Sequence, residues 1–262
     1  VFPTDGKVEL SRNRNLKLKG DITVGNFDFV GVDLLFDYES YKLDLLDIDT
    51  LKMISKKNLI DKYNYLYNIG GDLFINESNN KSSLKSSKNY PYFISDKSTK
   101  VFLNMPNEYG STYDSSFYFT IDQFQIDSLD KSTLPKFEFS GTFYSNNIFM
   151  PLEAQLVTMP DNSFGFDLDI GENGISAYNN KINVFEKLKV DSTGLYAEGN
   201  FTYNQLRVFS NKIRFFPDSL SGFTEKAFLY NGFSKSNEFY YPDMEFSNSE
   251  YSLYNFAEDY IY

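Results

Sequence analysis

The amino-acid sequence predicts an all-β fold, arranged as an extended, twisted antiparallel sheet or sheet pair of the meander, taco-like or sandwich type. Two observations predict it. Apolar and polar residues alternate with a period of two through most of residues 7–54 and again after residue 115, which is typical of strands with one buried face. The composition includes 27 Phe and 21 Tyr among 262 residues, and these residue types suit pleated surfaces. At most one short helix is expected.

Residues 1–75 are expected to form a β-meander. In "LKLKGDITV" (16–24) one strand face carries Leu16, Leu18, Gly20, Ile22 and Val24. "NFDFVGVDLLFDY" and "YKLDLLDIDTLKMI" continue the alternation after the short turn signals "VGN" and "DYES". Such short connections favour antiparallel neighbours, because a parallel return needs a dozen or more residues. The one candidate helix is "KKNLIDKYNYLYN" (56–68), although "YNYLYN" also alternates.

The rest of the chain divides into three further segments. Residues 76–114 are expected to form a long loop rich in Ser, Asn and Lys, which is either a solvated connection or a docking surface. Residues 115–216 are expected to be a second β segment of the same domain. Within "SSFYFTIDQFQID" (115–127) the apolar set changes parity near Gln123, which predicts a bulge or bend there. Residues 217–262 are expected to be an irregular tail rich in aromatic residues.

A seven-residue pattern occurs three times. The copies are "LKLKGDI" (16–22), "FEFSGTF" (137–143) and "LYAEGNF" (195–201), each with a glycine in step with two apolar positions. Glycine inside a strand commonly marks a bulge, a corner or a close backbone approach. Gly20, Gly141 and Gly199 are therefore predicted to be structural bend positions in a curved sheet.

Composition and charge exclude several kinds of chemistry. The net charge of −11 disfavours nucleic acid as a partner. The absence of His and Cys excludes a Ser-His-Asp triad and zinc sites built from those residues. No glycine-rich nucleotide motif is present, so we expect no cofactor and no enzymatic activity. No apolar run reaches about 18 residues, so no transmembrane segment is expected. The chain begins at Val1, which suggests a mature protein or a fragment of a longer one.

Carboxylates offer the remaining candidate chemistry. Asp47 and Asp49 share a strand face, and Asp167 and Asp169 form a similar pair, which two-carboxylate glycoside hydrolysis would require. The alternative is that both pairs lie on the solvent side of a strand. "DLDIGENG" (167–174) superficially resembles a calcium loop, but Gly171 stands at the third ligand position and Tyr178 at the twelfth. An EF-hand is thus rejected, and Asp167, Asp169 and Glu172 remain weak candidates for an irregular metal site.

Several segments resemble a known group of proteins. "FPTDG", "LSRNRNLKLKGD", "FDYESYKLDLLDIDTLK", "NNKSSLK", "IDSLD", "FSGTFYSNNIFMPLE", "MPDNSFGF" and "FFPDS", from Phe2 to about Ser219, resemble large uncharacterised β-rich envelope proteins of Bacteroidota-type bacteria. The resemblance implies a periplasmic or cell-surface location in a Gram-negative bacterium. It also implies that the partners are other envelope proteins or the rest of a longer chain. The Asp-Ser/Thr-apolar triplets at Thr50, Ser128 and Ser219 resemble the O-glycosylation acceptor pattern of such bacteria.

A looser resemblance is to AsmA- and TamB-type repeats, whose taco-shaped sheets form apolar grooves implicated in lipid transport. It implies that the face carrying Leu16, Leu18, Ile22 and Val24 could hold acyl chains, whereas packing against a second sheet is the alternative. The expected function is a non-enzymatic structural or scaffold segment of an envelope protein. A lipid-binding or lipid-transfer groove is one alternative. The other is a surface module that binds glycans or proteins through Tyr-rich patches such as "EFYYPD" and "YSLYNF".

Overall fold

The computed structural model describes residues 1–53, 65–103, 113–131, 136–230, 244–255 and 260–261. Within these ranges the secondary structure consists of strands and turns and contains no helix, so the all-β prediction is confirmed. The chain divides into two compact units. The first contains Val1–Phe102, Phe119–Gly141 and Leu156–Thr158, and the second contains Leu103–Tyr118, Thr142–Gln155 and Met159–Tyr262.

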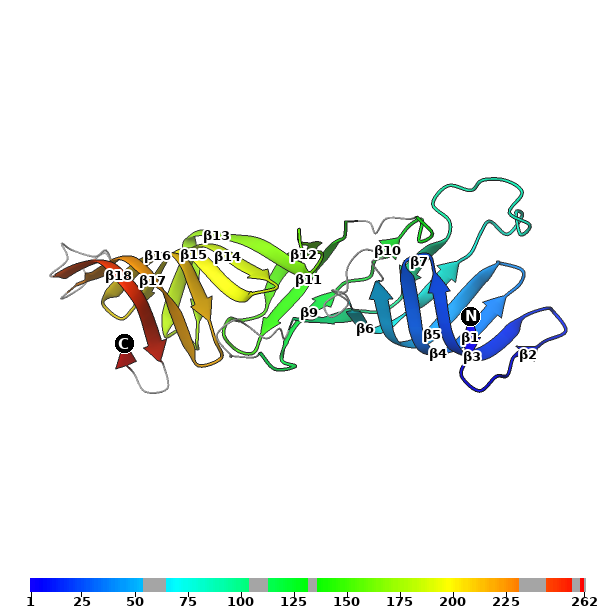
Figure 1. The fold of residues 1–262 in the computed structure, drawn as a ribbon, viewed down its shortest axis with the longest axis horizontal. Helices are drawn as coiled ribbons and strands as arrows, with labels where there is room; N and C mark the ends of the chain where they lie inside the picture. Colours follow the sequence, from blue (N-terminus) through cyan, green and yellow to red (C-terminus); the bar gives the residue numbers. More distant parts are fainter. Residues whose placement is uncertain (54–64, 104–112, 132–135, 231–243, 256–259, 262) are drawn as a thin grey trace. The chain divides into compact units, whose positions relative to one another are not determined.

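The first unit is an antiparallel meander whose strands follow the sequence order (Figure 1). Its main strands are β3 (Leu16–Val24), β4 (Phe27–Asp37), β5 (Lys42–Met53) and β6 (Tyr65–Phe74). β1 (Phe2–Pro3) and β2 (Glu9–Leu10) both pair with β3. β6 pairs with β7 (Tyr92–Ser95) and, further along, with β8 (Thr99–Phe102), and β7 pairs in turn with β10 (Gln125–Ile126).

The second unit is another antiparallel meander in sequence order (Figure 1). Its strands are β13 (Phe164–Ala177), β14 (Ile182–Asp191), β15 (Gly194–Tyr203), β16 (Leu206–Phe215), β17 (Ser219–Leu229), β18 (Met244–Asn255) and β19 (Tyr260–Ile261). β9 (Phe117–Ile121), β11 (Glu138–Ser145) and β12 (Leu152–Thr158) each contribute residues to both units.

Short polar turns fix the register of the hairpins. Gly25 and Asn26 form the two-residue turn between β3 and β4, and Gly25 has a φ of 58°. Two-residue hairpin turns need a positive φ at a central position, which glycine adopts at no steric cost. Ser192 and Thr193 connect β14 to β15, where Asp191 accepts hydrogen bonds from the backbone N–H and the hydroxyl of Thr193. These turns explain why successive strands are antiparallel neighbours.

The core of each unit is strongly aromatic. In the first unit the Phe29 ring contacts the Phe93 ring at 5.3 Å, and Phe27 meets Phe137 edge-on at 6.2 Å. In the second unit Phe143 contacts both Phe117 and Phe166, with ring centroids about 5 Å apart. All of these rings are at least 90% buried. Tilted and edge-to-face geometries are the favourable ones for aromatic pairs, so the Phe-rich composition supplies the packing of both units.

The structure corrects two expectations about organisation. Residues 76–114 are not a continuous loop, because β7 and β8 lie within them. Residues 217–262 are not an irregular tail, because they contain β17, β18 and β19. The chain, whose two β segments are expected to belong to one domain, divides into two compact units. The candidate helix at 56–68 falls mostly outside the described residues, and its last four positions begin strand β6.

The polar stretch before β7 is also more ordered than expected. Asn80 is buried, and its side-chain amide donates to the backbone oxygen of Lys85 at 2.7 Å and to the Ser87 hydroxyl at 3.1 Å. The Asn80 side-chain oxygen accepts a bond from the Lys85 backbone N–H at 3.1 Å. These bonds close a compact turn around Leu84, whose side chain is 89% exposed.

Candidate functional site

The most developed candidate site lies in the first unit, where the chain bends after β9. Phe119 and Ile121 of β9 are buried, whereas the next buried residue on β10 is Ile126. The inward-facing positions therefore change from odd to even numbers between the two strands. Gln123 and Gln125 are exposed, so the parity change expected near Gln123 is present.

Polar contacts with β7 produce this bend. The Asp122 N–H still donates to the Ser140 carbonyl of β11 at 3.0 Å, but the following residues turn toward Ser95. The Phe124 N–H donates to the Ser95 hydroxyl, and the Ser95 N–H donates to the Phe124 carbonyl, both at 2.9 Å. The Gln123 side-chain amide donates to the Asp96 carbonyl at 2.8 Å. β10 thus continues beside β7 instead of beside β11.

The divergence leaves an open cleft, which we call the β10–β11 cleft, with a volume of about 610 Å³. This volume lies within the range of about 300–1,000 Å³ typical of ligand sites. The cleft is lined by residues 121–127 and 136–140 together with Lys131.

The floor of the β10–β11 cleft is aromatic. Phe124 is half-buried, and its ring contacts Phe139 at 4.9 Å and Phe93 at 6.1 Å. Phe137 stacks on Phe139 at 5.3 Å with 17° between the ring planes. Because Phe137 and Phe139 are buried, the ring of Phe124 is the apolar surface most open to a ligand.

The rim of the cleft is polar and mixed in charge. Its ionisable side chains are all exposed and comprise three carboxylates and two amines: Asp122, Asp127, Glu138, Lys131 and Lys136. The Gln125 amide donates to Asp127 Oδ1 at 2.6 Å. The rim therefore offers acceptors from the carboxylates, donors from the lysines and both kinds from the amides.

A second, smaller hollow lies in the second unit and has a volume of about 380 Å³. It is lined by Tyr118 and Tyr144, which stack at 4.7 Å with 17° between their planes, and by serine and asparagine residues. The Tyr-rich patches singled out from the sequence are elsewhere. "EFYYPD" lies outside the described residues, and only the backbone of "YSLYN" is described, within β18.

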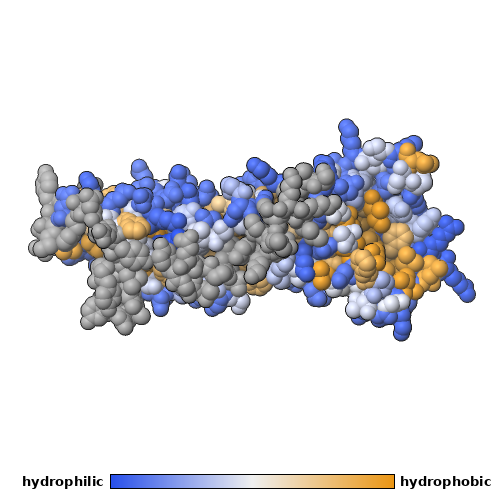
Figure 2. Space-filling view, in the orientation of Figure 1, coloured by the Kyte–Doolittle hydropathy of each residue, from blue (hydrophilic) through white to orange (hydrophobic). Residues whose placement is uncertain are grey.

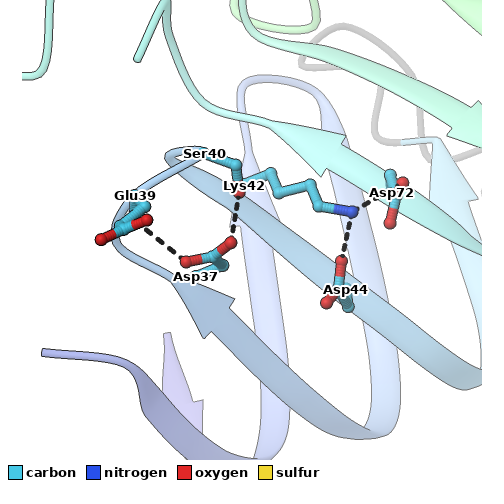
Figure 3. A network of polar contacts seen from close by, with 6 residues as sticks. All are labelled: Asp37, Glu39, Ser40, Lys42, Asp44 and Asp72. Atoms are coloured by element: carbon cyan, nitrogen blue, oxygen red, sulfur yellow. Dashed lines mark hydrogen bonds and ion pairs between the residues drawn. The ribbon is translucent and has the colours of Figure 1, made fainter. Parts of the chain in front are cut away.

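Carboxylates of β5 and β6, close to the candidate pair, contact one lysine. Lys42 Nζ lies 2.7 Å from Asp44 Oδ1 and 3.0 Å from Asp72 Oδ2. Figure 3 draws both contacts. These contacts raise the pKa of Lys42, chiefly through the interaction with Asp44. Asp44 and Asp72 stand directly opposite each other on β5 and β6, so the ammonium group offsets a repulsive cross-strand pair. In the same network the Ser40 hydroxyl donates to Asp37, which lowers the Asp37 pKa.

The side chains of Asp47 and Asp49 contact different groups. Asp47 Oδ1 accepts a bond from Lys97 Nζ at 3.2 Å. Asp49 lies against Gly31, where any side chain would overlap the Asp49 carboxylate. Gly31 has a φ of 70°, and its N–H donates to Asp21 at 2.8 Å. Asp47 and Asp49 are therefore not arranged as two carboxylates that flank one bond.

The carboxylates in "DLDIGENG" also face lysines. Asp167 pairs across the β13–β14 ladder with Lys189, and Asp169 pairs with Lys187. The Asp169 carboxylate accepts a bond from the Gly171 N–H at 2.9 Å, next to a register shift between the two strands. Among the described residues no three acidic side chains come close enough to hold a metal ion, and Asp167, Asp169 and Glu172 are all described.

The three repeated glycines occupy different surroundings. A side chain at Gly20 would overlap the Phe2 carbonyl of β1, and a side chain at Gly141 would overlap the Thr120 carbonyl of β9. A Cβ atom at Gly199 would lie 2.8 Å from the Glu186 side chain. Gly20 and Gly199 lie beside register shifts of the β3–β4 and β15–β16 pairs. A Cβ atom at Gly199 would also lie 2.8 Å from the Phe185 carbonyl oxygen, so all three positions mark close approaches between backbones.

The predicted apolar face of β3 is partly covered. Ile22 is buried, whereas Leu16, Leu18 and Val24 are half-buried. The exposed apolar residues of the first unit lie mainly before β3, with Phe2 and Leu10 each about 70% exposed. Figure 2 shows apolar surface over the strands of this unit.

The three glycosylation candidates differ in accessibility. Thr50 lies in the middle of β5, paired with Val30 and Tyr67, and is half-buried. Ser128 lies in the turn after β10 with a φ of 54°. Ser219 begins β17, and its hydroxyl donates to Asp218 at 3.1 Å. Ser128 thus lies outside a ladder, whereas Thr50 and Ser219 are both paired with neighbouring strands.

Two buried tyrosines were not singled out from the sequence. The Tyr113 hydroxyl donates to the Phe215 carbonyl at 2.5 Å and accepts from the Leu195 N–H at 3.2 Å, and burial raises its pKa to about 12. The Tyr178 hydroxyl contacts the carbonyl oxygens of Phe216 and Ser219 at 2.7 and 2.6 Å, and burial raises its pKa as well. Both hydroxyls reach the β16–β17 turn, so their role is to hold that turn. In a chain with 21 Tyr, no local signal distinguishes these two.

Comparisons with protein-family models, curated proteins and solved structures gave no match. Within the described part of the chain, no helix has the length and apolar character needed to span a membrane.

Proposed function

We propose that the chain is a non-enzymatic structural segment of a β-rich protein of the bacterial cell envelope. The envelope location comes from the resemblance of its sequence segments to Bacteroidota-type envelope proteins. Two antiparallel meanders with aromatic cores are consistent with a role in which the sheets serve as structural elements.

The contacts of the candidate catalytic carboxylates carry this proposal. Asp47 contacts Lys97 in the turn between β7 and β8, and Asp167 and Asp169 stand opposite lysines in the β13–β14 ladder. Opposite charges facing each other across a ladder stabilise the pairing of the strands. Carboxylates that face lysines in this way serve the pairing of the strands and do not converge on one reacting bond, as a two-carboxylate hydrolase would require.

The alternative of a lipid groove has weaker support. Ile22, at the centre of the predicted groove face, is 3% exposed, and the large apolar residues of β4 that follow it, Phe27 and Phe29, are about 1% exposed. A groove for acyl chains requires such side chains to be accessible to the lipid. The ligand-binding alternative has a specific observation in its favour, which is the β10–β11 cleft.

An activity screen tests the proposal. The purified chain would be incubated with chromogenic glycosides, esters, peptides and phosphate esters, beside the single variants Asp47→Asn and Asp169→Asn. Asp130→Asn, an exposed carboxylate away from both pairs, is the matched control. We expect no turnover above buffer for any of the four proteins. Turnover by the wild-type chain that disappears in one of the two test variants, and not in the control, would overturn the non-enzymatic role.

A further inference from the structure

We propose that the β10–β11 cleft of the first unit binds a neutral oligosaccharide. This inference concerns one surface of the chain and goes beyond the scaffold role. Sugar binding and the scaffold role are tested by separate experiments, because neither depends on the other.

The side chains of the rim match the chemistry of sugar hydroxyls. A hydroxyl group both donates and accepts hydrogen bonds, so a site for several hydroxyls needs both kinds of partner close together. Asp122 and Glu138 supply acceptors on the two diverging segments, and Lys136 supplies donors beside them. The Gln123 amide nitrogen is already bonded to the Asp96 carbonyl, which leaves its side-chain oxygen as an acceptor at the cleft.

The charges of the rim favour a neutral ligand. Three carboxylates and two lysines line the cleft, so neither sign dominates. A phosphorylated or otherwise anionic ligand would meet the three carboxylates, and a cationic one would meet the two lysines. All five groups are exposed and keep their hydration, so a weak and reversible interaction is expected.

The floor of the cleft suits the apolar C–H face of a sugar ring. Phe124 is half-buried between Phe93 and Phe139, so its orientation is fixed by packing while part of its ring remains accessible. A ring held in this way offers apolar contact area at little cost in side-chain entropy. Polar groups around one apolar surface are the usual composition of a small-molecule site.

The observations favour a sugar over an extended peptide. A peptide that adds to a sheet edge depends on a row of main-chain hydrogen bonds along a strand. The β10 side of the cleft offers a strand of only two residues, Gln125 and Ile126. Recognition must then come mainly from side chains, which is how hydroxyl-rich ligands are held.

Retention on polysaccharide gels tests the proposal. Native electrophoresis of the full chain would be run through gels containing a neutral polysaccharide, one each of soluble starch, xyloglucan, mannan and laminarin, with polygalacturonate as an anionic comparison. The test variant is Asp122→Asn combined with Glu138→Gln, both exposed and in the cleft. The control is Asp5→Asn combined with Glu9→Gln, which makes the same change in charge at exposed positions before β3. Circular dichroism would establish that both variants are folded.

We expect at least one neutral polysaccharide to retard the wild type and the control, with the dissociation constant raised at least tenfold in the cleft variant. Retardation by no neutral polysaccharide, or only by polygalacturonate, would overturn the proposal. Equal retardation of the cleft variant would place any sugar site elsewhere and would also overturn it. A random-peptide display screen that selects ligands competing at this cleft, without any neutral polysaccharide binding, would assign the cleft to peptides.

Discussion

Removing the Tyr113 hydroxyl perturbs the second unit in a way that depends on pH. In the variant Tyr113→Phe, the Phe215 carbonyl and the Leu195 N–H lose the hydroxyl that bridges them. A lost hydrogen bond that leaves buried groups unpaired costs about 1–3 kcal/mol, so we expect the free energy of unfolding to fall by about 2 kcal/mol at pH 7.5.

The same hydroxyl becomes unfavourable in alkali. The pKa of Tyr113 rises from 10.0 to about 12 because the folded chain buries the phenol. Stability from this group is fully present below pH 10 and is lost as the pH rises toward the folded pKa, because only the unfolded chain ionises readily in that window. At pH 11 the wild type loses about 1.4 kcal/mol that the Phe variant does not lose. The difference in the free energy of unfolding between the wild type and Tyr113→Phe therefore narrows from about 2 kcal/mol at pH 7.5 to about 0.6 kcal/mol at pH 11.

Urea unfolding followed by circular dichroism at pH 7.5 and pH 11 measures both quantities. Tyr144→Phe is the matched control, since Tyr144 is half-buried and stacks on Tyr118 through its ring. Its effect should stay within about 0.5 kcal/mol at both pH values. If the wild type and Tyr113→Phe have the same free energy of unfolding at pH 7.5, or if their difference does not change with pH, the burial and hydrogen bonding of the Tyr113 hydroxyl are refuted.

Three further substitutions test other parts of the fold. Gly141→Ala would place a methyl group against the Thr120 carbonyl and 2.7 Å from the Phe119 ring. The free energy of unfolding, measured with urea, should therefore fall by about 3 kcal/mol. A loss below about 1 kcal/mol would contradict the close approach of the backbones. Asn80→Ala removes the hydrogen bonds that close the turn around Leu84. Trypsin should therefore cleave after Lys85 about tenfold faster in the variant. An unchanged cleavage rate would contradict an ordered turn. Asp161→Asn should lower the free energy of unfolding near neutral pH and make it fall less steeply in acid. Bonds from Ser163 and Ser192 hold the Asp161 pKa below 3.8 despite burial, so stability from this carboxylate is present above pH 3.8 and is lost as the pH falls. Parallel acid-unfolding curves for the two proteins would contradict this.

The sequence predicts local features better than distant ones. The turn at Gly25 and Asn26, the alternation of β3 and the bend near Gln123 all follow from neighbouring residues, and the structure contains each of them. β7 and β8 were missed, since four residues each within a polar stretch give no clear period. They become strands because the outer edge of β6 pairs with them, at Phe74 with Tyr92 and at Tyr67 with Lys100.

The candidate site was predicted only in part for the same reason. The change of parity at Gln123 predicts that the chain bends, but it contains no information about where the chain goes next. That depends on Ser95, almost thirty residues earlier, which bonds both backbone groups of Phe124. The β10–β11 cleft is a consequence of this long-range contact, so alternation and composition could not reveal it.

The central claim is that carboxylates on the polar strand faces hold neighbouring strands together. A double-mutant cycle between Lys42 and Asp72 tests it most directly, using Lys42→Met, Asp72→Asn and the double variant. Lys42 Nζ lies 3.0 Å from Asp72, and both side chains are less than 40% exposed. The cycle for Lys19 and Asp33, a more exposed pair at 3.2 Å, is the comparison.

The account predicts a favourable coupling of about 1 kcal/mol for Lys42 and Asp72, and a smaller one for the exposed pair. Both couplings should weaken in 1 M salt, and that for Lys19 and Asp33 should weaken more. A coupling of zero between Lys42 and Asp72 at low salt would contradict the claim that these charges stabilise the pairing of β5 with β6.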